Sequence, residues 1–81
     1  METEIIRIED IYVPVKRRQT LEPAKVEDIA ESMLEVGQKT PITIRRDGER
    51  YVLISGLHRL EACKALGEET IAAVIGAARQ H

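Results

Sequence analysis

The side chains available for a hydrophobic core are almost all aliphatic, because this chain of 81 residues has no Phe, no Trp and two Tyr. A chain of this length buries only about 60% of the surface that its unfolded form exposes. It has room for one two-layer core and a shallow site, not for a large enclosed pocket. Hydrophobic residues at 43% and charged residues at 32% are typical of a folded globular domain. We therefore expect one domain over residues 1–81, with its core at 4–75 and a tail at 76–81.

Charge and cysteine content exclude several classes of protein. The net charge of −2 argues against non-specific adhesion to DNA or to anionic membranes. One cysteine, Cys63, cannot form an internal disulfide, and with two histidines it leaves too few ligands for the usual zinc site, so we expect no metal. No apolar run approaches the roughly 20 residues of a membrane span, and the N-terminus is acidic where a signal peptide is basic. We expect a cytoplasmic protein with no membrane contact.

Hydrophobic patterning predicts an α+β domain in the order β-α-β-β-α-β. Residues 4–8 are short and β-branched, which is typical of a strand. Pro23 suits the first position of a helix, and Gly37 suits its end. Between them one apolar stripe recurs at helical spacing, formed by Val26, Ile29, Ala30, Met33 and Leu34. The basic segment 16–20, before this helix, is expected to be an exposed loop.

The second half of the chain predicts a hairpin, a helix and a last strand. Strands are expected at 41–46 and 51–54, joined by a turn at Asp47-Gly48 whose loop could be longer than two residues. A helix is expected at 58–66, ended by Gly67. The β-branched segment 70–75 completes the sheet.

The junction at 54–59 (Ile-Ser-Gly-Leu-His-Arg) is the most informative segment for function. An apolar strand ends, Gly56 turns the chain, and a helix begins with His58 and Arg59 in its first turn. The first N–H groups of a helix have no partner within it, and the helix dipole places positive potential there. Glycine lets a ligand approach the backbone, and arginine adds a bidentate donor. The segment therefore predicts an anion site, with phosphate as the anion.

Cations are unfavourable at this end of a helix, so His58 and Arg59 break a local rule in the way functional sites do. A simpler interpretation pairs Arg59 with an acid such as Glu9 and leaves His58 in water. Lys25 has the same two interpretations, a ligand contact or a pair with Glu22 or Asp28. The residues alone leave these alternatives open.

Cys63 lies on the apolar stripe of the second helix, so we expect it to be buried and unreactive.

Several short segments together resemble the ParB/sulfiredoxin superfamily. They lie at 21–26, 41–42, 55–62 and 69–71, and the opening 8–14 is similar to the start of ParB N-terminal domains. The most specific of them are the Gly-x-His-Arg junction and the Pro-Ala-Lys-Val helix start. The resemblance covers nearly the whole chain. It implies a compact single-domain α+β fold that binds a nucleoside triphosphate, ATP or CTP, with or without Mg²⁺.

The resemblance also implies which residues bind the nucleotide. Phosphates rest at the start of the helix that follows the family glycine, which corresponds here to Gly56, Leu57, His58 and Arg59. Lys25, Asp28 and Ser32 correspond to the positions from which sulfiredoxins contact the nucleotide, although Asp28 is an acid where sulfiredoxins carry a hydroxyl. Either Arg17 or Arg18 corresponds to a family arginine that reaches the phosphates.

Departures from the family pattern separate the subfamilies. Leu57 stands where sulfiredoxins have their catalytic cysteine, so we expect no sulfiredoxin activity. His58 stands at the first arginine of the ParB Gly-x-Arg-Arg motif, and Ser55 stands where related small-molecule kinases place an acid. We also expect no sequence-specific DNA binding by this chain alone, because no helix-turn-helix element follows residue 76.

Two functional hypotheses remain. The first is a regulatory or partition-type module of ParB type, non-catalytic or slowly hydrolysing, which binds nucleotide and acts with a protein partner or as a weak homodimer. The second is an enzyme, either a small phosphotransferase or kinase or a ParB-like nuclease. A nuclease needs clustered acids for metal ions; Glu9 and Asp10 are the candidate catalytic residues, and their simpler role is to cap a turn.

Overall fold

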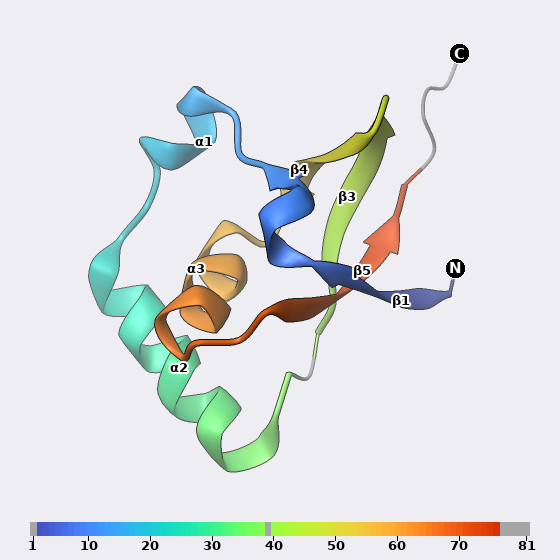
Figure 1. The fold of residues 1–81 in the computed structure, drawn as a ribbon. Helices are drawn as coiled ribbons and strands as arrows, with labels where there is room; N and C mark the ends of the chain where they lie inside the picture. Colours follow the sequence, from blue (N-terminus) through green and yellow to red (C-terminus); the bar gives the residue numbers. More distant parts are fainter. Residues whose placement is uncertain (1, 39, 77–81) are drawn as a thin grey trace.

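A computed structural model describes residues 2–38 and 40–76 of the chain (Figure 1). The tail predicted at 76–81 therefore lies, apart from Gly76, outside the described residues. The elements follow in the order β1 (Thr3–Arg7), the 3₁₀ turn η1 (Ile8–Asp10), β2 (Ile11–Tyr12), α1 (Val15–Arg18), α2 (Pro23–Val36), β3 (Ile42–Asp47), β4 (Arg50–Ser55), α3 (Leu57–Ala65) and β5 (Thr70–Ile75). The predicted α+β order is confirmed, with three short elements added between β1 and α2. Among the described residues, no helix is long and apolar enough to cross a membrane.

The five strands form one mixed sheet in the order β1-β5-β3-β4-β2. β5 lies antiparallel to β1 and parallel to β3, while β4 lies antiparallel to β3 and parallel to β2. The sequence analysis did not predict the edge strand β2, because this strand has only two residues and Pro14 follows shortly after it. It is held by its parallel pairing with β4, which sequence periodicity does not reveal.

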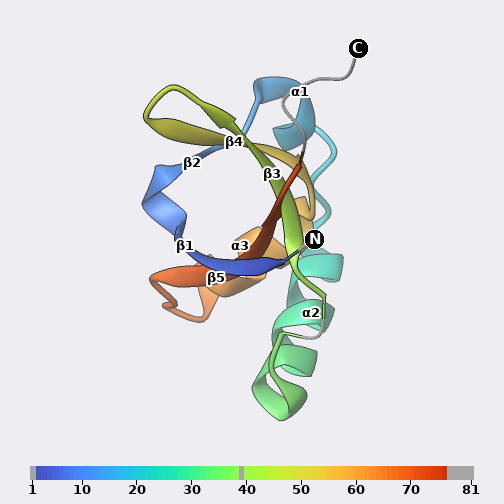
Figure 2. The same cartoon turned by 90° about the vertical axis from the view of Figure 1, so that its right-hand side faces the viewer.

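The two edge strands are consecutive in the chain, and this forces the sheet to curl. A flat sheet of five strands spans about 19 Å between its edges. Three residues of η1 separate β1 from β2, and a connection of that length reaches at most about 14 Å. Figure 2 shows the result: the strands curve so that β1 and β2 come to lie on the same side. The core lies within this curve.

The core is aliphatic, as the composition requires. Its four largest fully buried side chains come from β3, β4 and α3: Ile42, Ile44, Leu53 and Leu60. The first segment of the chain adds Ile6, Ile8, Ile11 and Val13 to the cluster. α3 supplies the layer that covers these side chains, and α2 lies outside α3 (Figure 1).

The apolar stripe of α2 is less buried than its pattern predicts. No residue of α2 is fully buried, and Leu34 is 73% exposed. The reason is topological, since α2 packs mainly against α3 instead of against the sheet. Its half-buried members are Val26, Ile29, Ala30 and Met33.

The β3–β4 hairpin has a two-residue loop, Gly48-Glu49, because Asp47 pairs with Arg50. Gly48 has φ of +65° and is the first central residue, which is the position of glycine in a type II′ turn. The central residues of the turn are therefore Gly48 and Glu49, one position later than the Asp47-Gly48 pair of the sequence analysis. Segment 16–20 is exposed as expected, but its first residues form the short helix α1 and not a loop.

Gln38 occupies the place of a missing strand partner. Its side-chain amide donates to the carbonyl of Ala72 over 2.9 Å, and its carbonyl oxygen accepts from the N–H of Ala72, also over 2.9 Å. The parallel pairing of β3 with β5 begins at Ile42, whose N–H reaches the Ala72 carbonyl, so the N–H of Ala72 is the group that would otherwise lack a strand partner. Gln38 thereby joins the end of α2 to the sheet.

Replacing Gln38 with Ala is expected to lower the free energy of unfolding by about 1–3 kcal/mol, because it leaves the backbone N–H of Ala72 without a partner. In a domain of this size, each kcal/mol moves the melting temperature by roughly 4–8 °C. Thermal and urea unfolding measure the change. Gln19→Ala, at the exposed end of α1, is the matched control and should change stability by less than about 0.5 kcal/mol. Equal effects of the two substitutions would contradict this role of Gln38.

Candidate functional site

Gly56 fixes the junction between β4 and α3. It has φ of +103°, and a Cβ atom at this position would lie 2.6 Å from Cγ2 of Ile42 and 2.9 Å from its Cβ. Both the backbone conformation and the contact exclude a side chain. The junction therefore packs its backbone directly against the first residue of β3.

The start of α3 presents backbone N–H groups without helical partners. The first intrahelical bond is donated by Leu60 to the carbonyl of Gly56, over 2.9 Å. The N–H groups of Leu57, His58 and Arg59 precede that bond, and Gly56 offers no side chain to cap them. This end of α3 has the positive potential that the sequence analysis predicts.

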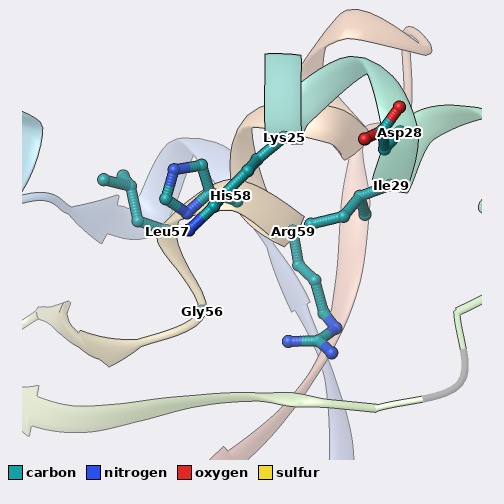
Figure 3. Close-up of a pocket in the computed structure, with 7 residues that line it drawn as sticks. All are labelled: Lys25, Asp28, Ile29, Gly56, Leu57, His58 and Arg59. Carbon is teal, nitrogen blue, oxygen red and sulfur yellow. The ribbon is translucent and has the colours of Figure 1, made fainter. Parts of the chain in front are cut away.

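A pocket of about 320 Å³ opens at this junction (Figure 3). Such a volume is at the small end for ligand sites, which fits the shallow site expected of a short chain. It is lined by seven residues from two helices: Lys25, Asp28 and Ile29 of α2, and Gly56, Leu57, His58 and Arg59 at the start of α3. Six of these seven are residues that the sequence analysis assigned to the nucleotide site.

Arg59 borders a second, adjoining hollow. This hollow has a volume of about 120 Å³ and includes Ser32, Met33 and Thr40 among its lining residues. It shares Ile29 and Arg59 with the first pocket. Ser32 therefore lies outside the pocket at the junction, in the adjoining hollow about one helical turn further along α2.

The charged residues of the pocket have different partners. Lys25 Nζ lies 3.4 Å from a carboxylate oxygen of Glu22. Of the two acidic partners that the sequence analysis considered for Lys25, Glu22 is therefore the one that pairs with it. Both side chains are about 60% exposed, and such a pair contributes little to stability. None of the ion pairs found among residues 2–38 and 40–76 involves Arg59, and Glu9 pairs with Arg7 instead. Arg59 therefore lines the pocket without an acidic partner among the described residues.

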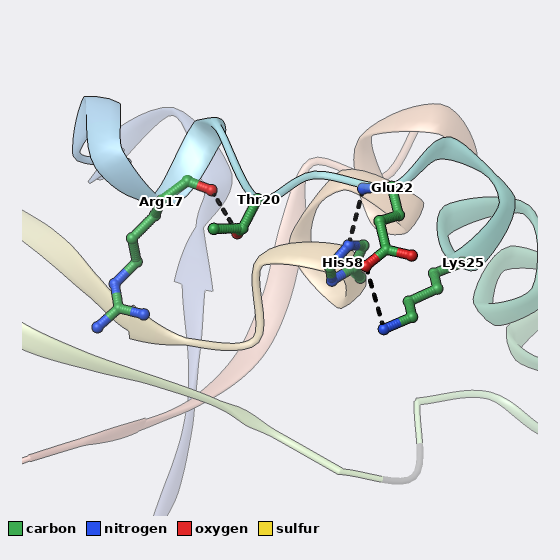
Figure 4. A network of polar contacts seen from close by, with 5 residues as sticks. All are labelled: Arg17, Thr20, Glu22, Lys25 and His58. Atoms are coloured by element: carbon green, nitrogen blue, oxygen red, sulfur yellow. Dashed lines mark hydrogen bonds and ion pairs between the residues drawn. The ribbon is translucent and has the colours of Figure 1, made fainter.

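His58 does not point into water. Its Nε2 atom accepts a hydrogen bond from the backbone N–H of Glu22 over 3.0 Å (Figure 4). The ring is half-buried and also lines the pocket. Sequence analysis missed this contact, because nothing in the local pattern relates positions so far apart in the chain.

The other predicted residues lie outside the pocket. Arg17 and Arg18 are exposed on α1, and neither lines the two hollows; in Figure 4, Arg17 extends toward the sheet, with Thr20 bonded to its carbonyl. Glu9 lines a different hollow with Arg7, Glu68 and Glu69, and Asp10 is exposed nearby in η1. No group of three side chains able to hold a metal ion occurs in the part of the chain that the structure describes.

Ile29 is the pocket residue that sequence analysis did not assign. It falls on the apolar stripe of α2, so its pattern predicts a core position. Because α2 lies outside α3, the side chain is only half-buried and reaches the pocket wall instead. Its apolar surface is suited to contact an uncharged part of a ligand.

Cys63 is buried, as predicted, with 4% of its surface exposed. Burial raises the pKa of its thiol, and the nearby carboxylate of Glu68 raises it further. Its sulfur lies 3.8 Å from that of Met33, between α3 and α2.

The fold, one curled five-stranded sheet with its helices, is that of the ParB/sulfiredoxin superfamily. Sulfiredoxin from Arabidopsis thaliana is similar over 94% of this chain and 85% of its own, with a TM-score of 0.84 and 29% sequence identity. The C-terminally truncated chromosome-partitioning protein ParB from Caulobacter crescentus, complexed with CTP-gamma-S, covers 99% of this chain with a TM-score of 0.82 and 23% identity.

Within this superfamily, the chain belongs to the ParB N-terminal domain family, whose sequence pattern matches residues 1–81. A probable chromosome-partitioning protein ParB from Campylobacter jejuni is 34% identical over 62 residues, which is 76% of this chain. The chain spans 22% of the length of that protein and 47% of the Caulobacter structure. The similarity therefore concerns one domain of these longer proteins.

Gly56→Ala is expected to destabilise the domain by more than about 2 kcal/mol, since it adds a clash with a buried side chain to the cost of a positive φ. Gly67→Ala is the matched control: Gly67 has φ of +79° with nothing within 4 Å of its Cβ position, so only the backbone cost of about 1–2 kcal/mol applies. Urea unfolding of the two variants measures the difference. Equal losses would show that the contact with Ile42 does not constrain the junction.

Cys63 should react slowly with alkylating reagents in the folded domain, because it is buried and its raised pKa lowers the fraction of thiolate. We expect labelling at pH 7.5 to be at least roughly ten-fold slower than in denaturant. Mass spectrometry over time measures both rates. Labelling as fast as in denaturant would contradict the burial of this side chain.

Proposed function

We propose that this domain is a nucleoside-triphosphate-binding module whose ligand places its phosphates at the start of α3, residues 56–59. The observation that carries the proposal is Arg59, a cation with no acidic partner among the described ion pairs, beside three backbone N–H groups that lack helical partners. Phosphate satisfies all of these donors together, and glycine leaves its approach to the backbone open.

Lys25 completes the charge of the proposed site from α2. Its pair with Glu22 is exposed, so exchanging Glu22 for a phosphate oxygen costs little. Asp28 lies on the same wall, where a carboxylate would repel a phosphate and would instead accept hydrogen bonds from a hydroxyl or amino group. We therefore assign Lys25 to the phosphates and Asp28 to the nucleoside. Ser32, in the adjoining hollow, extends the nucleoside side of the site.

The comparisons support nucleotide as the ligand class. The Caulobacter ParB structure, which shares this fold, is complexed with CTP-gamma-S. We propose CTP or ATP, with or without Mg²⁺, and we propose that Arg17 or Arg18 folds onto the phosphates from α1.

A binding module is favoured over an enzyme by the composition of the pocket. The residue after the glycine is Leu57, which is buried and has no nucleophilic atom, so the sulfinic chemistry of sulfiredoxins has no attacking group here. The candidate catalytic acids Glu9 and Asp10 do not line the pocket. We propose that nucleotide controls contact with a protein partner or a second copy of the chain, in a regulatory or partition role.

Saturating CTP or ATP should raise the melting temperature by several degrees, because a ligand at a hundred-fold excess over Kd stabilises the folded state by about 2.7 kcal/mol. Arg59→Ala should weaken binding by roughly ten-fold or more, since a charge-assisted bidentate contact contributes about 1.5–3 kcal/mol. Titration calorimetry and thermal scans, each with and without Mg²⁺, measure the two effects.

Arg46→Ala is the matched control for Arg59. Arg46 lies on β3 near the hairpin, stacked on Tyr51, and does not line the pocket. It should leave the affinity unchanged, while Arg59→Ala should leave the melting temperature of the free domain nearly unchanged. Absence of binding by CTP, ATP and GTP would contradict the proposal. An equal loss of affinity in both variants would show that the phosphates do not bind at residues 56–59.

A further inference from the structure

One hydrogen bond joins the starts of the two helices that form the pocket. The backbone N–H of Glu22 donates to His58 Nε2 over 3.0 Å. Glu22 is the N-cap residue of α2, and His58 is the second residue of α3. The bond therefore connects the two walls of the pocket at their first turns, as Figure 4 shows.

The direction of this bond fixes the protonation of the ring. A backbone N–H can only donate, so Nε2 must carry a free electron pair, and the proton of the neutral ring is on Nδ1. We infer that His58 is a positioning residue that acts as a neutral imidazole: its Nε2 holds the start of α2, and its Nδ1–H is the group it can offer to a ligand. This inference deepens the proposed function of the same pocket, but the bond itself exists without ligand.

The residue positioned through this bond is Lys25. Lys25 follows Glu22 by three residues and pairs with its carboxylate, and its backbone N–H donates to the Glu22 carbonyl over 3.0 Å. α2 has half-buried apolar contacts with α3 but no fully buried side chain. His58 therefore holds, through Glu22, the wall of the pocket that presents Lys25.

Protonation of His58 would break this connection, because a second N–H would then face the N–H of Glu22. The charged groups around the ring are Glu22, Lys25 and Asp28 from the start of α2 and Arg59 from its own helix. The bond therefore requires the neutral ring and is lost when Nε2 takes up a proton. A histidine that bound phosphate as a cation would show the opposite sign, with affinity rising as the pH falls.

Nitrogen NMR on the ligand-free domain tests the bond directly. We would use the His81→Gln variant, so that His58 is the only histidine. At pH 8 we expect an unprotonated Nε2, a protonated Nδ1 and a Glu22 amide protected from exchange, with this protection lost in step with protonation of the ring. A proton on Nε2 at pH 8, or a Glu22 amide that does not respond to the ring, would overturn the inference.

Two substitutions separate the two ring nitrogens. Gln at position 58 can place an acceptor oxygen near the position of Nε2, whereas Asn reaches only the position of Nδ1. We expect His58→Gln to keep the Glu22 amide protected and His58→Asn to lose this protection. His58→Asn should bind nucleotide roughly five-fold more weakly than His58→Gln, as expected for one lost hydrogen bond.

The outcomes distinguish this inference from the proposed function. If the NMR result is as expected but no nucleotide binds, the proposed function fails and the role of His58 in holding α2 stands. If nucleotide binds but Gln and Asn weaken it equally, or binding strengthens steadily from pH 8 to pH 5, His58 is a direct phosphate ligand and the inference is wrong.

Discussion

The pocket depends on the contact between the Gly56 backbone and the Ile42 side chain. Ile42 begins the central strand β3 and is among the most buried residues of the chain. Because the glycine rests directly on it, the first turn of α3 is held by the core itself. The N–H groups of that turn are held in position and direction, so the anion proposed to bind there would require no rearrangement of the backbone.

The opposite wall of the pocket is held very differently. α3 contributes Leu57, Leu60, Ala62 and Cys63 to the interior, whereas α2 contributes no fully buried side chain. α2 is positioned by polar contacts near its two ends, through Glu22 to His58 and through Gln38 to Ala72. One wall is thus fixed by buried packing, and the other by half-buried apolar contacts with α3 together with hydrogen bonds near its two ends.

How much of this could be predicted from sequence follows from the range of the interactions. The junction at Gly56 was predictable because strand, glycine and helix signals are adjacent in the chain. The assignment of Lys25 and Asp28 to the same pocket came from the family resemblance, and the helical spacing only placed them on one face. The hydrogen bond between Glu22 and His58 joins distant segments and uses a backbone N–H, so no pattern of side chains in the sequence predicts it. The exposure of Leu34 also followed from topology, since the pattern shows an apolar face and not what covers it.

The pairing of β1 with β5 has a consequence for how the domain assembles. Thr3 pairs with Val74, so this ladder joins the two ends of the described chain, while the β3–β4 hairpin joins neighbours. Bringing β1 and β5 together closes a loop of nearly the whole chain, which costs more conformational entropy than closing the hairpin. This cost is compensated only when many contacts between distant segments form together. The hairpin and α3 can therefore organise early, whereas β1 can join the sheet only after the rest of the chain has collapsed onto it. The curled edge made by β1 would then be the last part of the domain to form and the first to open.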